Sequence, residues 1–185
     1  MSLKYVGSRN GAQRNLEPAL LYNSITVEVG DVVEVYTNGY ATNGAAATPV
    51  KGIVHAITDT KLLPPEVSSN TPGTASSPAT LTVTTAADNT TTKAYYVLVD
   101  TSKDSLYSAE VSGTLGTTGS STLPGCRIDI DSANTDYGRL LETTATRTVA
   151  TTANFYSHGV DSNDSTRLIV SIASSEELSA PTTET

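Results

Sequence analysis

The sequence predicts an all-β protein, folded as an antiparallel β-sandwich or a partly open β-barrel. Short stretches in which apolar and polar residues alternate recur along the chain, and clusters of Gly, Asn, Asp, Ser and Pro separate them. Strands and turn signals spaced in this way are typical of sandwiches and small barrels. Thr is abundant, and it favours a pleated, half-exposed strand surface over a helix. With no Trp and one Phe, the core must be built from aliphatic side chains.

The most regular alternation lies at Ile25–Tyr36. Ile25, Val27 and Val29 alternate with polar residues, Gly30-Asp31 interrupts the pattern, and a second alternation follows. A Gly-X pair between two strands suits a two-residue type II′ hairpin turn. It suits equally a kink where one strand turns the corner of a small barrel. Both interpretations place an antiparallel sheet here.

Further strands are expected downstream. Ala94–Asp100 is the most apolar run, which predicts a central strand, and the turn signal at Lys103-Asp104 predicts a hairpin with the strand after it. Arg167–Ala173 is expected to close the domain as its last strand. Between two of the strands, Leu62–Pro78 is a long Pro-rich excursion, and loops of this length are usually functional or disordered. The other predicted strands are Pro49–Thr58, Thr80–Thr85, Leu106–Val111, Cys126–Ile130 and Phe155–Val160.

The chain divides into an extended N-terminal arm (1–23), a β-rich domain (24–173) and a loose polar C-terminal tail (174–185). The arm shows little periodicity, and its LEPALL stretch is too short and too interrupted by Pro for a stable helix. Its apolar residues need a cover, supplied either by the domain or by a neighbouring molecule. These residues are Leu16, Leu20, Leu21 and Tyr22.

Charge and composition exclude several classes of function. The formal net charge is −8, and the basic residues are scattered singly. Nucleic-acid binding requires a cationic footprint, so DNA and RNA are not expected partners. The acidic balance favours solubility or docking on a basic surface. No apolar run approaches the roughly 20 residues that span a bilayer, and the first residues lack the apolar core of a secretory signal, so no membrane partner is expected.

The candidates for catalysis have simpler explanations. His55 lies within a predicted strand, His158 stands beside a glycine, and Cys126 alternates with Ile128 and Ile130 as a small buried residue would. A single cysteine also excludes an internal disulfide. The chain contains no phosphate-binding loop, zinc-ligand pattern or nucleophile elbow. We therefore expect no enzyme and no cofactor.

Two acidic groups offer oxygen ligands of the kind that calcium prefers. The spacing of the first group departs from an EF-hand loop, and Asp and Asn are also ordinary turn formers. Turn formation is the favoured interpretation, and no metal is expected. The groups are Asp129, Asp131, Asn134 and Asp136, and Asp161, Asn163 and Asp164.

A set of segments occurs in an order that carries a family resemblance. In chain order, the segments are MSLKYVGSRNGA, SITVEVGDVVEVYTNG, VKGIVHAI, AYYVLVDTSKDSLYSAEVSGTLGTTGS, LPGCRIDIDSAN and SHGVDSNDSTRLIVSIA. The first of them precedes a sheet-starting stretch around Gly-Asp, and the third, VKGIVHAI, fits a V-x-G-I/V-x-x-A strand. Their order resembles that in the capsid decoration (cement or head-stabilising) proteins of tailed bacteriophages, over most of Ser24–Ala173. Leu62–Pro78 has no counterpart in the resemblance.

The resemblance implies a structural virion protein, made in the host cytoplasm, on the outer face of an icosahedral head. It would bind after shell expansion, bridge neighbouring major capsid proteins, and assemble with itself as a trimer or dimer. We expect residues 4–22 to bind the capsid or a neighbour. The residues expected to make the contact are Lys4, Leu16, Leu20, Leu21 and Tyr22.

An alternative function is a β-sandwich module, on a head or tail fibre, that recognises a carbohydrate on the host surface. Aromatic side chains would stack on sugars there. Tyr is also enriched where one end of the side chain is buried, so a role in the core or an interface is the favoured interpretation. The tyrosines concerned are Tyr36, Tyr40, Tyr107, Tyr137 and Tyr156.

Overall fold

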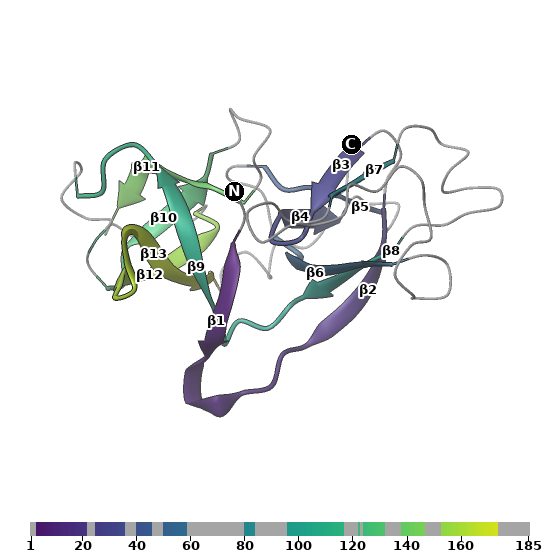
Figure 1. Ribbon diagram of the computed structural model, residues 1–185, viewed down its shortest axis with the longest axis horizontal. Coiled ribbons are helices and arrows are strands. Elements are labelled where there is room, and N and C mark those ends of the chain that lie inside the picture. The colour runs from purple at the N-terminus through teal and green to yellow at the C-terminus, as the bar shows by residue number, and fades with distance from the viewer. Residues whose placement is uncertain are drawn as a thin grey trace, which may run out of the picture.

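The computed structural model describes residues 3–21, 25–35, 40–45, 50–58, 80–83, 96–116, 122, 124–131, 138–146 and 153–173. These residues form strands, with one short 3-10 turn, η1 (Arg9–Gly11). The predicted all-β class is confirmed (Figure 1). Within these ranges the chain contains no helix long and apolar enough to cross a membrane.

The first sheet closes on itself. Neighbouring strands pair in the order β9, β11, β10, β12 and β13, and β13 returns to pair with β9, which completes a small barrel. β1 adds to β9. Because Tyr107 and Ser108 pair with both β1 and β13, these two strands lie on opposite edges of β9. The bounds are β1 Lys4–Ser8, β9 Ser105–Ser112, β10 Arg127–Ile130, β11 Leu140–Thr146, β12 Phe155–Asp161 and β13 Asp164–Ile172.

The second sheet is antiparallel and has the order β2, β8, β6, β4, β5. An isolated parallel bridge between Leu21 and Ala41 connects its two outer strands. β8 lies between β2 and β6, which confirms the central strand predicted at Ala94–Asp100. A separate pair, β3 and β7, completes the described strands. The bounds are β2 Leu16–Leu20, β3 Ile25–Glu28, β4 Val32–Val35, β5 Ala41–Asn43, β6 Gly52–Thr58, β7 Thr80–Val83 and β8 Tyr96–Asp100.

The two sheets share one boundary. Val32 and Ile53 belong to the core of the first barrel, whereas the next residues, Val33 and Val54, belong to the core of the second sheet. Successive residues of a strand point to opposite faces, so β4 and β6 present one face to each core. The second sheet is therefore packed directly on the first barrel.

Gly30-Asp31 forms a corner between sheets. The Asp31 N–H donates to the Glu28 carbonyl oxygen (3.1 Å), and Gly30 has a φ of 96°, which glycine adopts without steric cost. β3 pairs with β7, whereas β4 pairs with β5 and β6. The corner interpretation therefore holds, and the hairpin interpretation does not.

The hairpin predicted around Lys103-Asp104 is wrong. β8 belongs to the second sheet and β9 to the first, so residues 101–104 carry the chain from one sheet to the other. By contrast, β12 and β13 do form a hairpin, with Asp161 paired to Asp164 across the predicted turn.

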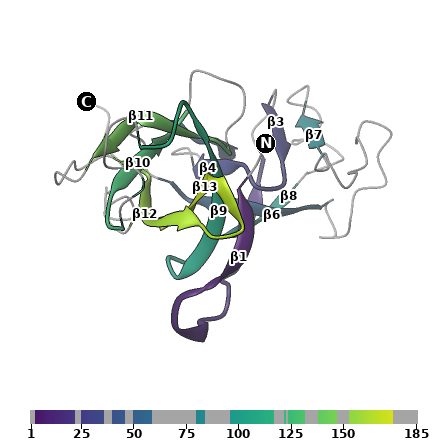
Figure 2. The ribbon, with the colours of Figure 1, turned by 60° about the vertical axis from the view of Figure 1, so that its left-hand side comes forward.

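The N-terminal residues expected to form an arm lie within the fold. β1 pairs with β9, and β2 pairs with β8, so residues 4–20 belong to both sheets (Figure 2 shows β1 alongside β9). The N-terminal residues show little alternation of apolar and polar side chains because β1 and β2 are each only five residues long. The boundary expected at residue 23 therefore does not separate an arm from the β-rich part. The tail (174–185), Leu62–Pro78 and Tyr22 lie outside the described residues.

Candidate functional site

The N-terminal segment, here residues 3–21, pairs antiparallel with residues 96–108 through both of its strands. Ser8 pairs with Ser105 in the first sheet, and Leu16 pairs with Asp100 in the second. Between these strands, the Arg9 N–H donates to the Asp104 carbonyl oxygen (2.7 Å). The two chain segments thus cross between the sheets side by side, and Figure 1 shows them together at the lower edge of the molecule.

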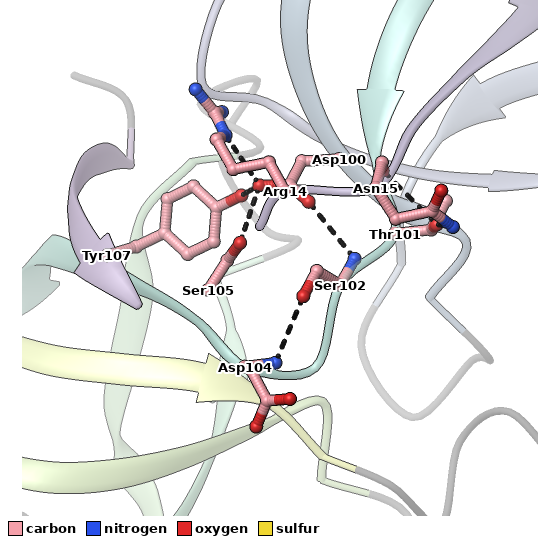
Figure 3. Close-up of polar contacts among 8 residues, drawn as sticks. All are labelled: Arg14, Asn15, Asp100, Thr101, Ser102, Asp104, Ser105 and Tyr107. Atoms are coloured by element: carbon pink, nitrogen blue, oxygen red, sulfur yellow. Dashed lines mark hydrogen bonds and ion pairs between the residues drawn. The ribbon is translucent and has the colours of Figure 1, made fainter. Parts of the chain in front are cut away.

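Asp100 lies at this crossing with its side chain fully buried. Its Oδ2 accepts hydrogen bonds from Arg14 Nε (2.9 Å), the Ser105 hydroxyl (2.7 Å) and the Tyr107 hydroxyl (2.6 Å), as Figure 3 shows. Its Oδ1 accepts the Ser102 N–H (3.0 Å). A buried carboxylate is tolerated only when its oxygens are paired in this way, so the network is a condition for the crossing to form.

The network fixes the charges of its members. Burial by itself would raise the pKa of Asp100, but hydrogen bonds from Tyr107, Ser105 and Arg14 outweigh it and hold that pKa below its ordinary value. Burial, together with the hydrogen bond to Asp100, raises the pKa of Tyr107. At neutral pH the carboxylate is therefore ionised and the phenol is neutral.

Arg14 is held on two sides. Its Nε pairs with Asp100, and its Cζ lies 4.1 Å from the centroid of the Tyr5 ring. Tyr5 in turn meets Tyr107 edge to face, with centroids 5.9 Å apart. The Arg14 side chain remains 21% exposed, and the outer end of its guanidinium points away from Asp100 and Tyr107 (Figure 3). The arginine is thus fixed in place while part of its donor fork stays accessible.

The residues predicted to contact the capsid or a neighbour divide into two groups. Lys4 and Leu16 are exposed on edge strands. Leu20 is half-buried, and Leu21 is fully buried in the core of the second sheet. Leu21 is therefore a core residue of its own chain. The cover that the sequence demanded for this leucine comes from the domain.

The sequence did not single out Tyr5 or Val6. Tyr5 pairs with Tyr107 and Gly7 with Leu106, so Val6 is the extra residue of a β-bulge. Tyr5 is 40% and Val6 51% exposed. The signal that could have revealed the bulge is Gly7, because glycine within a strand often marks one.

The candidate nucleophile and base residues lie within strands or directly beside one. The His158 Nε2 lies 2.9 Å from the Ser171 hydroxyl, but Ser171 is fully buried. Cys126 is also fully buried. Burial, and then repulsion by Arg14, lowers the pKa of His55, so this imidazole is neutral at pH 7.

The acidic candidates have protein partners. Asp131 pairs with Arg139 (3.0 Å), and Asp161 accepts hydrogen bonds from the Ser108 hydroxyl (2.6 Å) and the Asn163 N–H (2.9 Å). Within the ranges described above, no group of three or more His, Cys, Asp or Glu could hold a metal ion. Asn134 and Asp136 fall outside those ranges.

The tyrosines proposed for sugar stacking do not form one set. Tyr107 is 1% exposed and serves the Asp100 network, so its assignment to an exposed surface is wrong. Tyr40 is half-buried, and half-buried Tyr156 lies under Arg127, with 4.8 Å from Cζ to the ring centroid. Tyr36 and Tyr137 lie outside the described residues.

The geometry defines a class: an all-β protein in which two sheets are joined by a paired crossing, with exposed apolar side chains on the outer strands of that crossing. The chain matches no protein-family model, no curated protein and no solved structure.

Proposed function

We propose that this protein is a structural component of a tailed-phage virion that decorates the capsid exterior and bridges major capsid proteins through its N-terminal segment. The resemblance of its segment order to capsid decoration proteins supports the proposal. The structural observation that carries it is the location of exposed apolar side chains. Of the four large exposed hydrophobic residues within the described ranges, Tyr5, Val6 and Leu16 belong to this segment.

Edge strands give this surface a second means of binding. β1 and β2 are the terminal strands in the order of their sheets, and the bridge to Ala41 begins only at Leu21, after the end of β2. A terminal strand can pair its outward backbone N–H and C=O groups with a partner. Pro18 lies in β2 and the bulge at Val6 lies in β1. Both devices limit uncontrolled pairing between edges, which leaves side-chain contact as the main source of specificity.

Repetition makes a small contact sufficient. Fully burying a Val or Leu side chain contributes roughly 1.5–3 kcal/mol, and simultaneous contacts from a dimer or trimer bind far more tightly than one contact. A decoration protein presents many identical copies to a shell, so modest contacts of Val6 and Leu16 would hold neighbouring capsid subunits together against internal pressure.

The test is co-sedimentation with expanded heads assembled from the major capsid protein of the same phage. The double variant Val6→Ser/Leu16→Ser should lower occupancy without changing thermal stability. Val160→Ser is the matched control, because Val160 is also 40% exposed but lies in β12, outside the N-terminal segment. Deletion of residues 2–22 is not a clean test, because Leu3 and Leu21 are core residues.

Two outcomes would overturn the proposal. Wild-type protein that fails to sediment with heads would remove the capsid as partner, and binding of the isolated protein to a glycan array would then favour the carbohydrate module. Equal occupancy of the double variant and Val160→Ser would remove the N-terminal segment as the contact.

A further inference from the structure

The N-terminal segment carries the first three cations of an acidic protein. Lys4, Arg9 and Arg14 precede the first acidic residue, Glu17, although the whole chain has a net charge of −8. Glu17 is itself paired with Lys51. Arg9 lies 3.6 Å from Asp104, but both side chains are more than two-fifths exposed, and exposed pairs of this kind contribute little. This segment therefore differs in charge from the rest of the chain.

Arg14 is the cation of this segment that pairs with a buried carboxylate. The buried Asp100 carboxylate holds Nε, the Tyr5 ring supports the guanidinium plane, and the outer end points away from both Asp100 and Tyr107 (Figure 3). An arginine fixed in this way loses little side-chain entropy when it binds. Because the Arg14–Asp100 pair is neutral as a whole, its selectivity comes from the direction of its N–H donors.

A guanidinium has donors and no acceptor, and its planar fork matches a carboxylate with two parallel hydrogen bonds. Tyr5 stacks on the guanidinium and is 40% exposed, which favours a ligand with an apolar group beside the charge. Three spaced cations in a chain of net charge −8 are a poor footprint for a polyphosphate backbone. The chemistry therefore favours an acidic protein segment over a nucleic acid.

We propose that Arg14, stacked on Tyr5 and anchored by Asp100, is the centre of a docking site for a carboxylate-bearing segment of a partner protein. The site requires an Asp or Glu, or a chain-terminal carboxylate, beside an apolar side chain that packs on Tyr5. Identification of that partner as the major capsid protein rests on the proposed function. The inference that the partner carries a carboxylate does not depend on that function.

The first experiment needs no variant. Side-chain Nε–Hε signals of wild-type protein are followed by NMR during titration with the peptide Glu-Leu-Glu-Leu, with Lys-Leu-Lys-Leu and with inorganic phosphate. The Arg14 signal should shift with the glutamate peptide and stay in place with the lysine peptide. No shift with the glutamate peptide overturns the proposal. A shift with phosphate as large as that with the glutamate peptide overturns the assignment to a protein partner.

The second experiment uses the expanded heads. Arg14→Gln should lower the affinity for heads about tenfold to a hundredfold, as loss of a charged bidentate contact does, and Arg14→Lys should restore only part of it. Arg127→Gln is the control, because Arg127 also stacks on a tyrosine, but on β10. Unchanged affinity of Arg14→Gln overturns the proposal and leaves the capsid function standing. If the Arg14 signal of wild-type protein shifts with the glutamate peptide but the protein does not bind heads, only the capsid function is overturned. If Arg14→Gln does not fold, the titration decides.

Discussion

Arg14 and Asp100, 86 positions apart in the chain, form an ion pair in which Nε lies 2.9 Å from Oδ2 at the crossing between the two sheets. The carboxylate is fully buried and the guanidinium is partly exposed. Asp100 therefore lies wholly in the interior, whereas Arg14 lies partly in the interior and partly at the surface. This division links the stability of the crossing to the geometry of the surface beside it.

Asp100→Ala should reduce the free energy of unfolding by about 3–5 kcal/mol, the usual effect of removing one partner from a buried pair. The change leaves Arg14, Ser105 and Tyr107 without their common acceptor. Urea unfolding followed by circular dichroism measures it. Asp164→Ala is the control, because this aspartate is exposed and its carboxylate accepts hydrogen bonds from Thr166, two residues along the chain, so the loss should be no more than about 1 kcal/mol. Equal effects of the two variants would show that the network does not stabilise the crossing.

The Asp100 contribution should disappear in acid. Its folded pKa lies below the ordinary value of 3.8, so the folded state binds the proton less readily than the unfolded state does. Stability from this group is therefore fully present above that value and declines as the pH falls through the folded pKa. The difference in unfolding free energy between wild type and Asp100→Asn should be constant from roughly pH 5 to 8, where the carboxylate is ionised in both the folded and the unfolded state. Below about pH 4 the difference should shrink. A difference that grows in acid would contradict the assignment.

Leu21→Ala should destabilise the protein by about 2–5 kcal/mol, as truncation of a buried leucine does. Leu16→Ala should change stability by less than about 1 kcal/mol, because Leu16 is 39% exposed. Thermal and urea unfolding of the two variants measure the contrast. Similar losses would mean that the two leucines are equally buried in solution, and the distinction between a core residue and a surface residue would fail.

Gly52→Ala should be more destabilising than Gly44→Ala. A Cβ at Gly52 would lie 2.4 Å from the Asp100 carbonyl oxygen, whereas the nearest atom at Gly44 is a side-chain carbon of Val32 at 2.8 Å. Backbone cannot move aside as a side chain can, so we expect a loss above about 3 kcal/mol at Gly52 and about 1–3 kcal/mol at Gly44. The order of the two midpoints in urea tests this, and a reversed order would contradict the close approach of β6 to β8.

The positions of strands followed from the sequence, but their partners did not. The apolar run at Ala94–Asp100 and the apolar residues within Pro49–Thr58 and Arg167–Ala173 predict strands close to the observed bounds of β8, β6 and β13, because such local patterns report which residues of a strand are buried. The Lys103-Asp104 turn signal predicts a hairpin, yet the same residues lead from one sheet to the other. Turn residues describe a local change of direction, and the strand that receives the chain is chosen by packing far away in sequence.

The contact residues show the same limit. Leu16 and Leu21 look alike in the sequence, and only the pairing of β2 with β8 and the bridge from Leu21 to Ala41 separate the exposed leucine from the buried one. Arg14 looked like an isolated cation. Its partner, Asp100, ends the most apolar strand, where a charged residue would ordinarily be read as the start of a loop.

The sequence by itself determined the all-β class, the central position of β8 and the turn between β12 and β13, because alternation, apolar runs and turn chemistry are local properties of the chain. The tertiary structure alone decided that residues 3–21 cross both sheets, that Gly30 turns a corner, and that Asp100 gathers Arg14, Ser105 and Tyr107. These features depend on contacts between distant segments, whose stability comes from shared burial and from pairing a carboxylate away from water. No local pattern encodes that pairing.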